Sequence, residues 1–185
     1  MYSSTNTSKL YLACLIAPCL MVLCWYDWRY RKLPNLMTMG LATLGAVARL
    51  YIGGMEGLID GALGGLVCGL FLFIPFLLKS AGGGDVKMML ATGVIVGFRY
   101  SFAEMLFVSI VGLALAIVMM CFGKVTAKRL VHYLRIIFDW RYDRKKGEEG
   151  LPPKENEKGR IPFGVAIAIG TLATLAYAYW LEAGT

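Results

Sequence analysis

The sequence predicts an all-α, polytopic membrane protein with six transmembrane helices and a basic cytoplasmic segment between the fifth and sixth helices. Two features of composition support this fold class: 58% of the 185 residues are hydrophobic and only 17% are charged, against about 25% charged residues in soluble proteins. In addition, the charged residues fall between long apolar runs, as in polytopic membrane proteins. The net charge of +7 lies in these loops, so nucleic acid is not an expected partner. We expect residues 1–185 to form one transmembrane domain.

The expected helices are six apolar runs, at 10–26, 36–52, 58–78, 86–98, 102–122 and 161–181. The first is interpreted as a retained helix and not as a signal peptide, because a basic flank follows it and no small-residue cleavage site precedes that flank. The fourth run has only 13 residues, which is short for a span of about 20. We therefore expect it to begin within the preceding glycines, to tilt, or to lie inside the bundle.

The positive charges predict the orientation. Sixteen Lys and Arg lie in segments that share one side of the six helices, and only Lys9, Arg49 and Arg99 lie on the other. By the positive-inside rule the first side is cytoplasmic, which predicts a multi-pass protein of the bacterial cytoplasmic (inner) membrane with both termini outside. Eleven of these cations fall in 123–160. We expect this segment to begin as an amphipathic stretch on anionic inner-leaflet lipids, or as an extension of the fifth helix, and to continue as a mobile loop.

No cofactor or metal is predicted. The five cysteines lie inside apolar runs without a CxxC pair, which excludes a zinc site of the usual spacing. The single histidine, His132, leaves no Ser-His or Cys-His arrangement for nucleophilic catalysis. Asp60 and Glu104 lie near the start of the third and fifth runs, and we expect both to be solvated at the outer surface.

Two acids stand apart from the others. Asp27 ends the first run and Asp85 begins the fourth, so the topology places both at the cytoplasmic side at the same depth. If their helices touch, the two carboxyl groups could share a proton and act as general acid and base on a water molecule and a peptide bond. The alternative is that Asp85 caps a helix after a glycine turn and that Asp27 pairs with Arg29 or Arg31.

The surroundings of these acids resemble the type IV prepilin peptidases, which are intramembrane aspartyl proteases of the GxGD type. Three stretches carry the resemblance, at 27–38, 82–89 and 161–168. The first has an Asp, then a Pro-Asn pair seven positions later, then a Thr; the second has the glycine-aspartate pattern; the third has a Pro-Phe-Gly sequence before an apolar run. All three occur in the family's order, and the resemblance leaves out only the loop from about 124 to 159.

The resemblance implies a six-helix aspartic-type endopeptidase with Asp27 and Asp85 as the catalytic pair. It implies prepilin or pseudopilin substrates, cut at the cytoplasmic face after a short basic leader and before an apolar helix. The chain has no four-cysteine motif ahead of its first helix, so it is similar to the short, peptidase-only form that serves tight-adherence (Flp) pili. We expect no methyltransferase activity.

Other residues of the three stretches are expected to bind substrate or to shape the site. These are Pro34, Asn35, Gly82, Gly83, Gly84, Lys87, Pro162, Phe163 and Gly164. The glycines would leave room for an extended peptide. Asn35 could cap the second helix, and Lys87 could either pair with Asp85 or only anchor the chain at the interface.

Other functions remain as alternatives. A transporter or proton channel would also use buried carboxylates, but such sites lie near the membrane midplane between repeated halves, and the chain has no repeat. A non-catalytic pilus assembly factor would not need both aspartates. An archaeal preflagellin peptidase would use the same chemistry.

Overall fold

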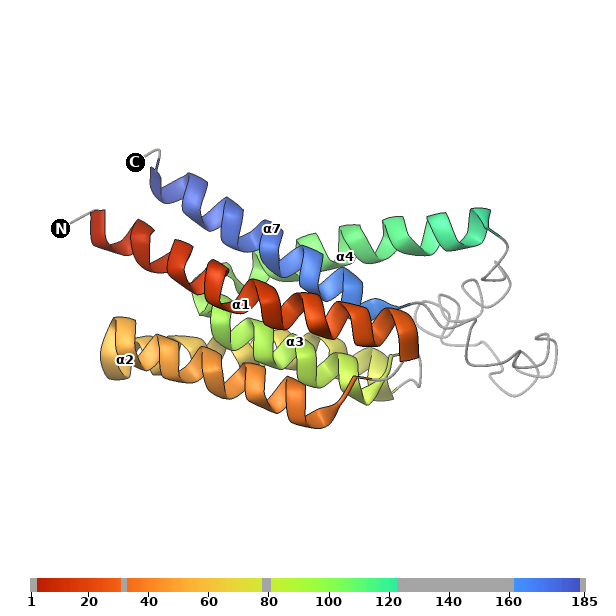
Figure 1. Ribbon diagram of the computed structural model, residues 1–185, viewed down its shortest axis with the longest axis horizontal. Helices are drawn as coiled ribbons and strands as arrows, with labels where there is room; N and C mark the ends of the chain where they lie inside the picture. The colour runs from red at the N-terminus through yellow and green to blue at the C-terminus, as the bar shows by residue number, and fades with distance from the viewer. Residues whose placement is uncertain (1–2, 31–32, 78–80, 123–161, 184–185) are drawn as a thin grey trace, which may run out of the picture. The chain divides into compact units, whose positions relative to one another are not determined.

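The computed structural model describes residues 3–30, 33–77, 81–122 and 162–183, and their side chains from residue 15 onward. The described residues form α1 (Ser3–Tyr30), α2 (Asn35–Leu77), α3 (Gly83–Val96), α4 (Phe98–Cys121) and α7 (Phe163–Ala183), shown in Figure 1. The predicted all-α class is therefore confirmed. The chain divides into two compact units, Met1–Gly112 with Pro162–Thr185, and Leu113–Ile161. In the second unit, the described residues continue α4 to its end.

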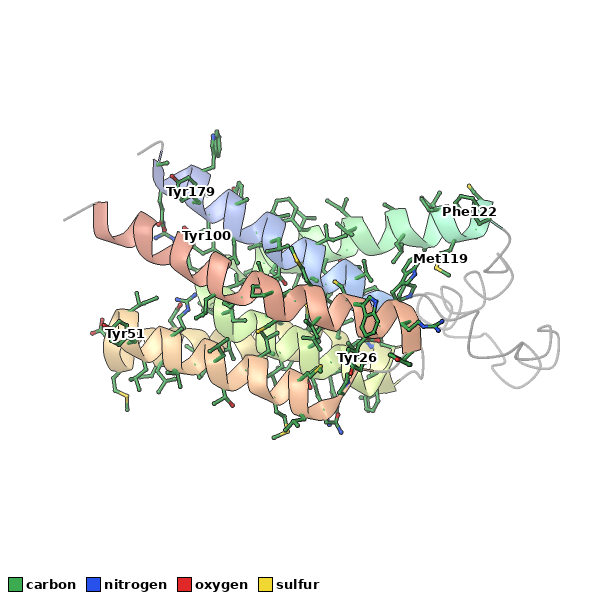
Figure 2. All side chains as sticks on the ribbon, in the orientation of Figure 1. Tyr26, Tyr51, Tyr100, Met119, Phe122 and Tyr179 are labelled. Carbon is green, nitrogen blue, oxygen red and sulfur yellow. The ribbon has the colours of Figure 1, made fainter. Side chains whose placement is uncertain are left out.

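Three of the described helices, α2, α4 and α7, are long and apolar enough to cross a membrane. Aromatic side chains lie toward both ends of the first unit. Tyr26 lies near the C-terminal end of α1, whereas Tyr51 and Tyr179 lie toward the opposite end (Figure 2). The neighbouring Trp25 and Trp28 are largely exposed. Aromatic residues at two levels are typical of the two interfaces of a membrane protein.

Helix α2 consists of two arms that fold back on each other (Figure 1). The sequence predicts separate helices at 36–52 and 58–78, and the structure confirms two helices, which join across a kink at Gly54 with φ 61° and ψ −148°. This positive φ favours glycine because a Cβ atom would be strained against the residue's own backbone. Nη1 of Arg49 on the first arm donates to Oδ2 of Asp60 on the second at 3.0 Å, which joins the arms beside the turn.

Glycines allow α2 to pack closely against α3. A Cβ atom added to Gly64 would lie 2.5 Å from the carbonyl oxygen of Gly93, and one added to Gly93 would lie 2.6 Å from that of Gly64. On the first arm, Gly45 faces the side chain of Ile95 in the same way. Small residues let membrane helices approach until their backbones touch, which increases van der Waals contact where the hydrophobic effect adds little.

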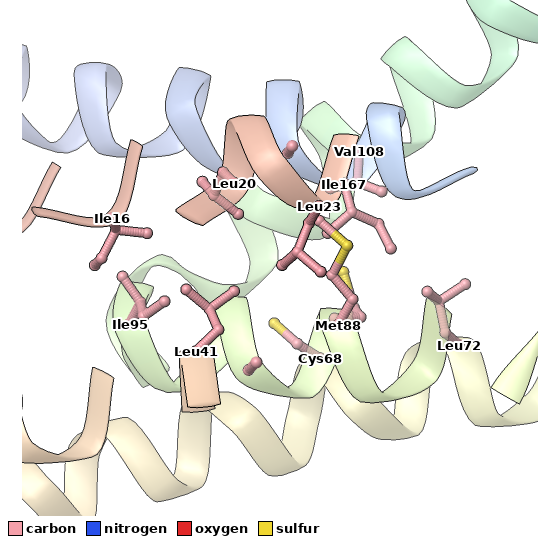
Figure 3. Close-up of a cluster of buried hydrophobic side chains, with 13 residues drawn as sticks. Ile16, Leu20, Leu23, Leu41, Cys68, Leu72, Met88, Ile95, Val108 and Ile167 are labelled. Carbon is pink, nitrogen blue, oxygen red and sulfur yellow. The ribbon is translucent and has the colours of Figure 1, made fainter. Parts of the chain in front are cut away.

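One apolar cluster joins the helices of the first unit, as Figure 3 shows. Its buried members are Ile16, Leu20, Leu23, Leu41, Cys68, Leu72, Met88, Met89, Ala91, Ile95, Val108, Ile167 and Ala168. Large apolar side chains such as Leu66, Ile74 and Leu106 are exposed on the outer faces, as expected of helices that face lipid. The core therefore lies among α1, α2, α3, α7 and the first half of α4.

The helix bounds differ from the apolar runs at several ends. The first helix was expected at 10–26 but continues to Tyr30. The fourth, predicted from the short run at 86–98, begins at Gly83, which confirms the expectation that it starts within the preceding glycines. Hydropathy marks where apolar residues stop, whereas backbone hydrogen bonds and caps decide where a helix stops. The predicted amphipathic and mobile segment at 123–160 lies outside the described residues.

Candidate active site

The three stretches predicted to form the site meet at one end of the first unit. The C-terminal end of α1 and the N-terminal ends of α3 and α7 lie together there (Figure 1). Two contacts bring them together: Leu33, just after α1, lies against Gly84 of α3, and the amide of Gly164 of α7 reaches Asp27 of α1. Residues 137 positions apart are thereby brought into hydrogen-bond contact.

Asp27 is buried, with 5% of its surface exposed. Its Oδ2 accepts a hydrogen bond of 2.8 Å from the backbone N–H of Gly164, in the first turn of α7, where amide groups have no partner within the helix. The same turn begins with Pro162, whose carbonyl oxygen accepts from the N–H of Val165 at 3.2 Å. The N-terminus of α7 thus presents an amide donor and a partial positive charge to the Asp27 carboxyl group.

Only glycine fits at position 164 without displacing Asp27. A Cβ atom there would lie 2.8 Å from Asp27 Oδ2 and 3.1 Å from its Cγ, closer than a Cβ atom tolerates. The neighbouring Phe163 packs against Gly112 of α4, where a Cβ atom would lie 2.9 Å from the ring. The Pro-Phe-Gly sequence therefore places the Gly164 amide and the start of α7 beside α1, and the Phe163 ring against α4.

Asp85 is partly exposed and lies in the first turn of α3. Its Oδ2 accepts from the backbone N–H of Gly82 at 3.0 Å, which is the returning half of a capping box. The capping alternative had Asp85 in the cap position. The structure instead has Gly82 in that position, and Asp85 three residues later. Gly83 lies against the Phe76 ring.

Lys87 and Asn35 meet beside this turn. Nζ of Lys87 donates to Oδ1 of Asn35 at 2.9 Å, at an exposed position. The first turn of α2 is closed instead by the carbonyl oxygen of Pro34, which accepts from the amides of Met37 and Thr38 at 3.1 and 3.2 Å. The sequence analysis expected the side chain of Asn35 to cap α2. In the structure this side chain instead connects α2 to α3.

Asp27 and Asp85 each lie about one helical turn from a residue of the same buried apolar cluster. Leu23 precedes Asp27 by four residues, and Met88 follows Asp85 by three. Leu23, Met88 and Ile167 belong to one buried cluster, and Ile167 follows Gly164 by three residues (Figure 3). Two carboxyl groups at one end of a helix bundle, one buried and one partly exposed, are a suitable arrangement for general acid and base catalysis.

The chain matches the type IV leader peptidase family over residues 14–117. It belongs to this family. The match includes Asp27 and Asp85 and confirms the resemblance to this family, whereas the stretch at 161–168 lies outside the matched residues. Membership implies aspartic peptidase activity and a role in cleaving prepilin leader peptides. Neither the comparison with curated proteins nor the comparison with solved structures gives a match.

Two other acidic residues, Asp60 and Glu104, were expected to be solvated at the outer surface, and the structure differs for both. Asp60 is paired with Arg49 and is not simply solvated. Glu104 is fully buried, whereas solvation at the outer surface was expected. Ser101, Glu104, Val108 and Gly112 share one face of α4, and all four are buried.

Proposed function

We propose that this chain is an intramembrane aspartyl endopeptidase that removes the short leader from type IV prepilin or pseudopilin precursors, with Asp27 and Asp85 as its catalytic pair. The observation that carries the proposal is the meeting of the three stretches at one end of the bundle, through the hydrogen bond from Gly164 N–H to Asp27 Oδ2. Family membership supports the same reaction class.

In the proposed mechanism, one aspartate is ionised and removes a proton from the attacking water. The other is protonated and donates to the scissile peptide group, so that the pair exchanges roles during the cycle. The amide of Gly164 fixes the orientation of the Asp27 carboxyl group. The Gly82 amide does the same for Asp85. Gly83 and Gly84, whose missing side chains let Phe76 and Leu33 lie close by, shape the turn beside it.

We further propose six membrane crossings: α1, the two arms of α2, then α3, α4 and α7. The site then lies at the cytoplasmic face of the bacterial inner membrane, both termini lie outside, and anionic lipids contact the cytoplasmic side. The distribution of Lys and Arg supports this orientation. The exposed aromatic residues at both ends of the first unit agree with two interfaces.

The test is cleavage of a candidate prepilin by the purified protein in detergent, followed as loss of the leader. Asp27→Asn and Asp85→Asn should fold, bind substrate and lose cleavage by at least about 10³-fold, as expected when an acid or base is removed from a coupled pair. Asp60→Asn is the control, because Asp60 lies beside the turn at Gly54, away from the candidate site. Near wild-type cleavage by either of the first two variants would refute the assignment.

A further inference from the structure

A fully buried carboxyl group joins the helices of the first unit. Glu104 of α4 has no exposed surface. Its Oε1 lies 2.9 Å from Oγ1 of Thr171 on α7, and its Oε2 accepts from Sγ of Cys68 on α2 at 3.3 Å. Thr92 of α3 interacts with the same carboxyl group. One side chain of α4 therefore holds α2, α3 and α7 together.

The hydroxyl partners of Glu104 also lie within hydrogen-bond distance of a carbonyl oxygen of their own helix. Oγ1 of Thr171 lies 2.8 Å from the carbonyl oxygen of Ile167 and 2.9 Å from Oε1 of Glu104, and its single proton can serve only one of these acceptors at a time. Thr92 donates to the carbonyl oxygen of Met89 at 3.1 Å. A hydroxyl that donates within its own helix can also accept from Glu104 when the carboxyl group carries a proton.

The charge balance favours the protonated form of Glu104. Among the described residues, the groups that interact with Glu104 are two hydroxyls and a thiol, and none of them is a cation. A buried carboxylate without a cation is strongly unfavourable, whereas the neutral acid both donates and accepts. Glu104 is therefore a neutral acid that donates to Thr171 and accepts from Cys68.

This cluster lies at a defined distance from the candidate site. Thr171 follows Gly164 by seven residues on α7, and Thr92 follows Asp85 by seven on α3. Seven residues of helix correspond to about 10 Å, or two turns. Glu104 thus connects, at one common level, the helix that supplies the amide for Asp27 and the helix that carries Asp85.

We propose that Glu104 is a positioning residue for the peptidase reaction, an inference that rests on the function proposed above. As a neutral acid it fixes the axial register of α7 relative to α3. This register sets the height of the Gly164 amide, and with it that of the Asp27 carboxyl group, relative to Asp85. Loss of the connection lets α7 shift, so the effect falls on kcat, because the acids are misplaced while the substrate-binding surface is kept.

Two threonines of α7 provide a matched pair of variants. Thr171 and Thr174 are both fully buried and each donates to the carbonyl oxygen four residues earlier, but only Thr171 reaches Glu104. Thr171→Val should lower kcat about tenfold, the loss expected for one buried hydrogen bond. Thr174→Val should leave kcat within about twofold, because it removes only a bond within its own helix.

Two substitutions of Glu104 test its protonation state by function. Glu104→Gln should keep kcat within about threefold, because its amide group donates to Thr171 and its oxygen accepts from Cys68, as the neutral acid does. Glu104→Leu should lower kcat by about 10–100-fold, as a small misplacement of catalytic groups does. In both variants KM should change by less than about threefold. An equal loss in the Gln and Leu variants, or in the two threonine variants, would overturn the proposal.

An infrared difference spectrum gives a readout that does not depend on cleavage. The spectrum of the wild type minus that of Glu104→Gln at neutral pH should contain the C=O stretch of a buried carboxylic acid. Carboxylate bands in its place would overturn the inference even if the enzyme cleaves prepilin. If the acid band is present but Asp27→Asn and Asp85→Asn cleave normally, the proposed function fails and the positioning role fails with it, while the neutral state of Glu104 stands.

Discussion

At the scale of single residues, the Asp27 carboxyl group depends on a backbone amide from a distant part of the chain. The donor, Gly164, lies at the start of α7, and its missing side chain leaves the space that the carboxyl group occupies. A backbone donor is fixed by the fold and needs no reorganisation during reaction, which is the property expected of a preorganised catalytic site. Position 164 therefore tests the site without changing any ionisable group.

Gly164→Ala should lower cleavage by about 10²-fold, the loss associated with an ångström-scale misplacement. The new Cβ atom would push against Oδ2 and Cγ of Asp27, which move more easily than backbone. The unfolding temperature should change little for the same reason. Gly40→Ala is the control, because no atom lies within 4 Å of a Cβ there. Equal cleavage by the two variants would contradict the role given to Gly164.

The proposed two-aspartate mechanism predicts that metal chelators do not change the rate of prepilin cleavage. Among the described residues, no three His, Cys, Asp or Glu side chains gather as metal ligands, and a pair of carboxyl groups can activate water without a metal. Prepilin cleavage measured with an excess of a divalent-metal chelator should equal cleavage without it. Inhibition that added zinc reverses would contradict the two-aspartate mechanism.

At the scale of elements, the closest packing is that of the second arm of α2 on α3. Gly64 and Gly93 bring the two backbones together, and Arg49 closes the far end of α3 by donating from Nε and Nη2 to the carbonyl oxygen of Ile95 at 3.0 and 2.8 Å. A cation at a helix C-terminus satisfies a free carbonyl and interacts favourably with the dipole. This short helix is thus held along its length by α2, which keeps Asp85 in place at its start.

Gly64→Ala should destabilise the protein by about 1–3 kcal/mol, the usual cost of overpacking. Its Cβ atom would meet backbone atoms of Gly93 and Gly97, which cannot move without separating the helices. Gly40→Ala in the same helix should instead be neutral or stabilise by about 0.5–1 kcal/mol, because alanine favours a helix where space is free. Thermal or denaturant unfolding in detergent measures both, and a similar change in the two variants would argue against backbone contact.

At the scale of the whole molecule, most Lys and Arg residues are predicted to lie on the same side of the membrane as the candidate site. The cations of the chain gather on the side that carries Asp27 and Asp85 in the predicted topology. The leader of a prepilin is itself basic according to the family resemblance, so these cations are better suited to orient the protein and bind lipid than to hold substrate. The orientation in the membrane then decides which compartment supplies the substrate.

Reporter fusions test this orientation. A reporter that is active only outside the cytoplasm should be active when fused after Thr185 and inactive when fused after Gly150, because sixteen of the nineteen Lys and Arg favour the cytoplasmic side of the second fusion. Immunoblotting of both fusions controls for expression. Activity in the reverse pattern would place the candidate site on the opposite face.

The sequence by itself determined the all-α class, the family and the two acids to examine. Apolar runs and motif spacings are local properties, and they are visible without knowledge of packing. The roles of Asp27 and Asp85 as a catalytic pair remain a prediction. The sequence analysis also singled out Gly164, but it could not say that its amide serves Asp27, because that contact joins residues 137 positions apart.

Only the tertiary structure decided which face of each helix points inward. A helix in lipid is apolar on all sides, so its hydrophobic pattern does not fix its rotation about its own axis. For this reason the burial of Glu104, its contacts with Cys68 and Thr171, and the fold-back at Gly54 became apparent only in the assembled bundle. The sequence predicted which residues could carry the chemistry, and the packing of the helices decided which side chains are in contact.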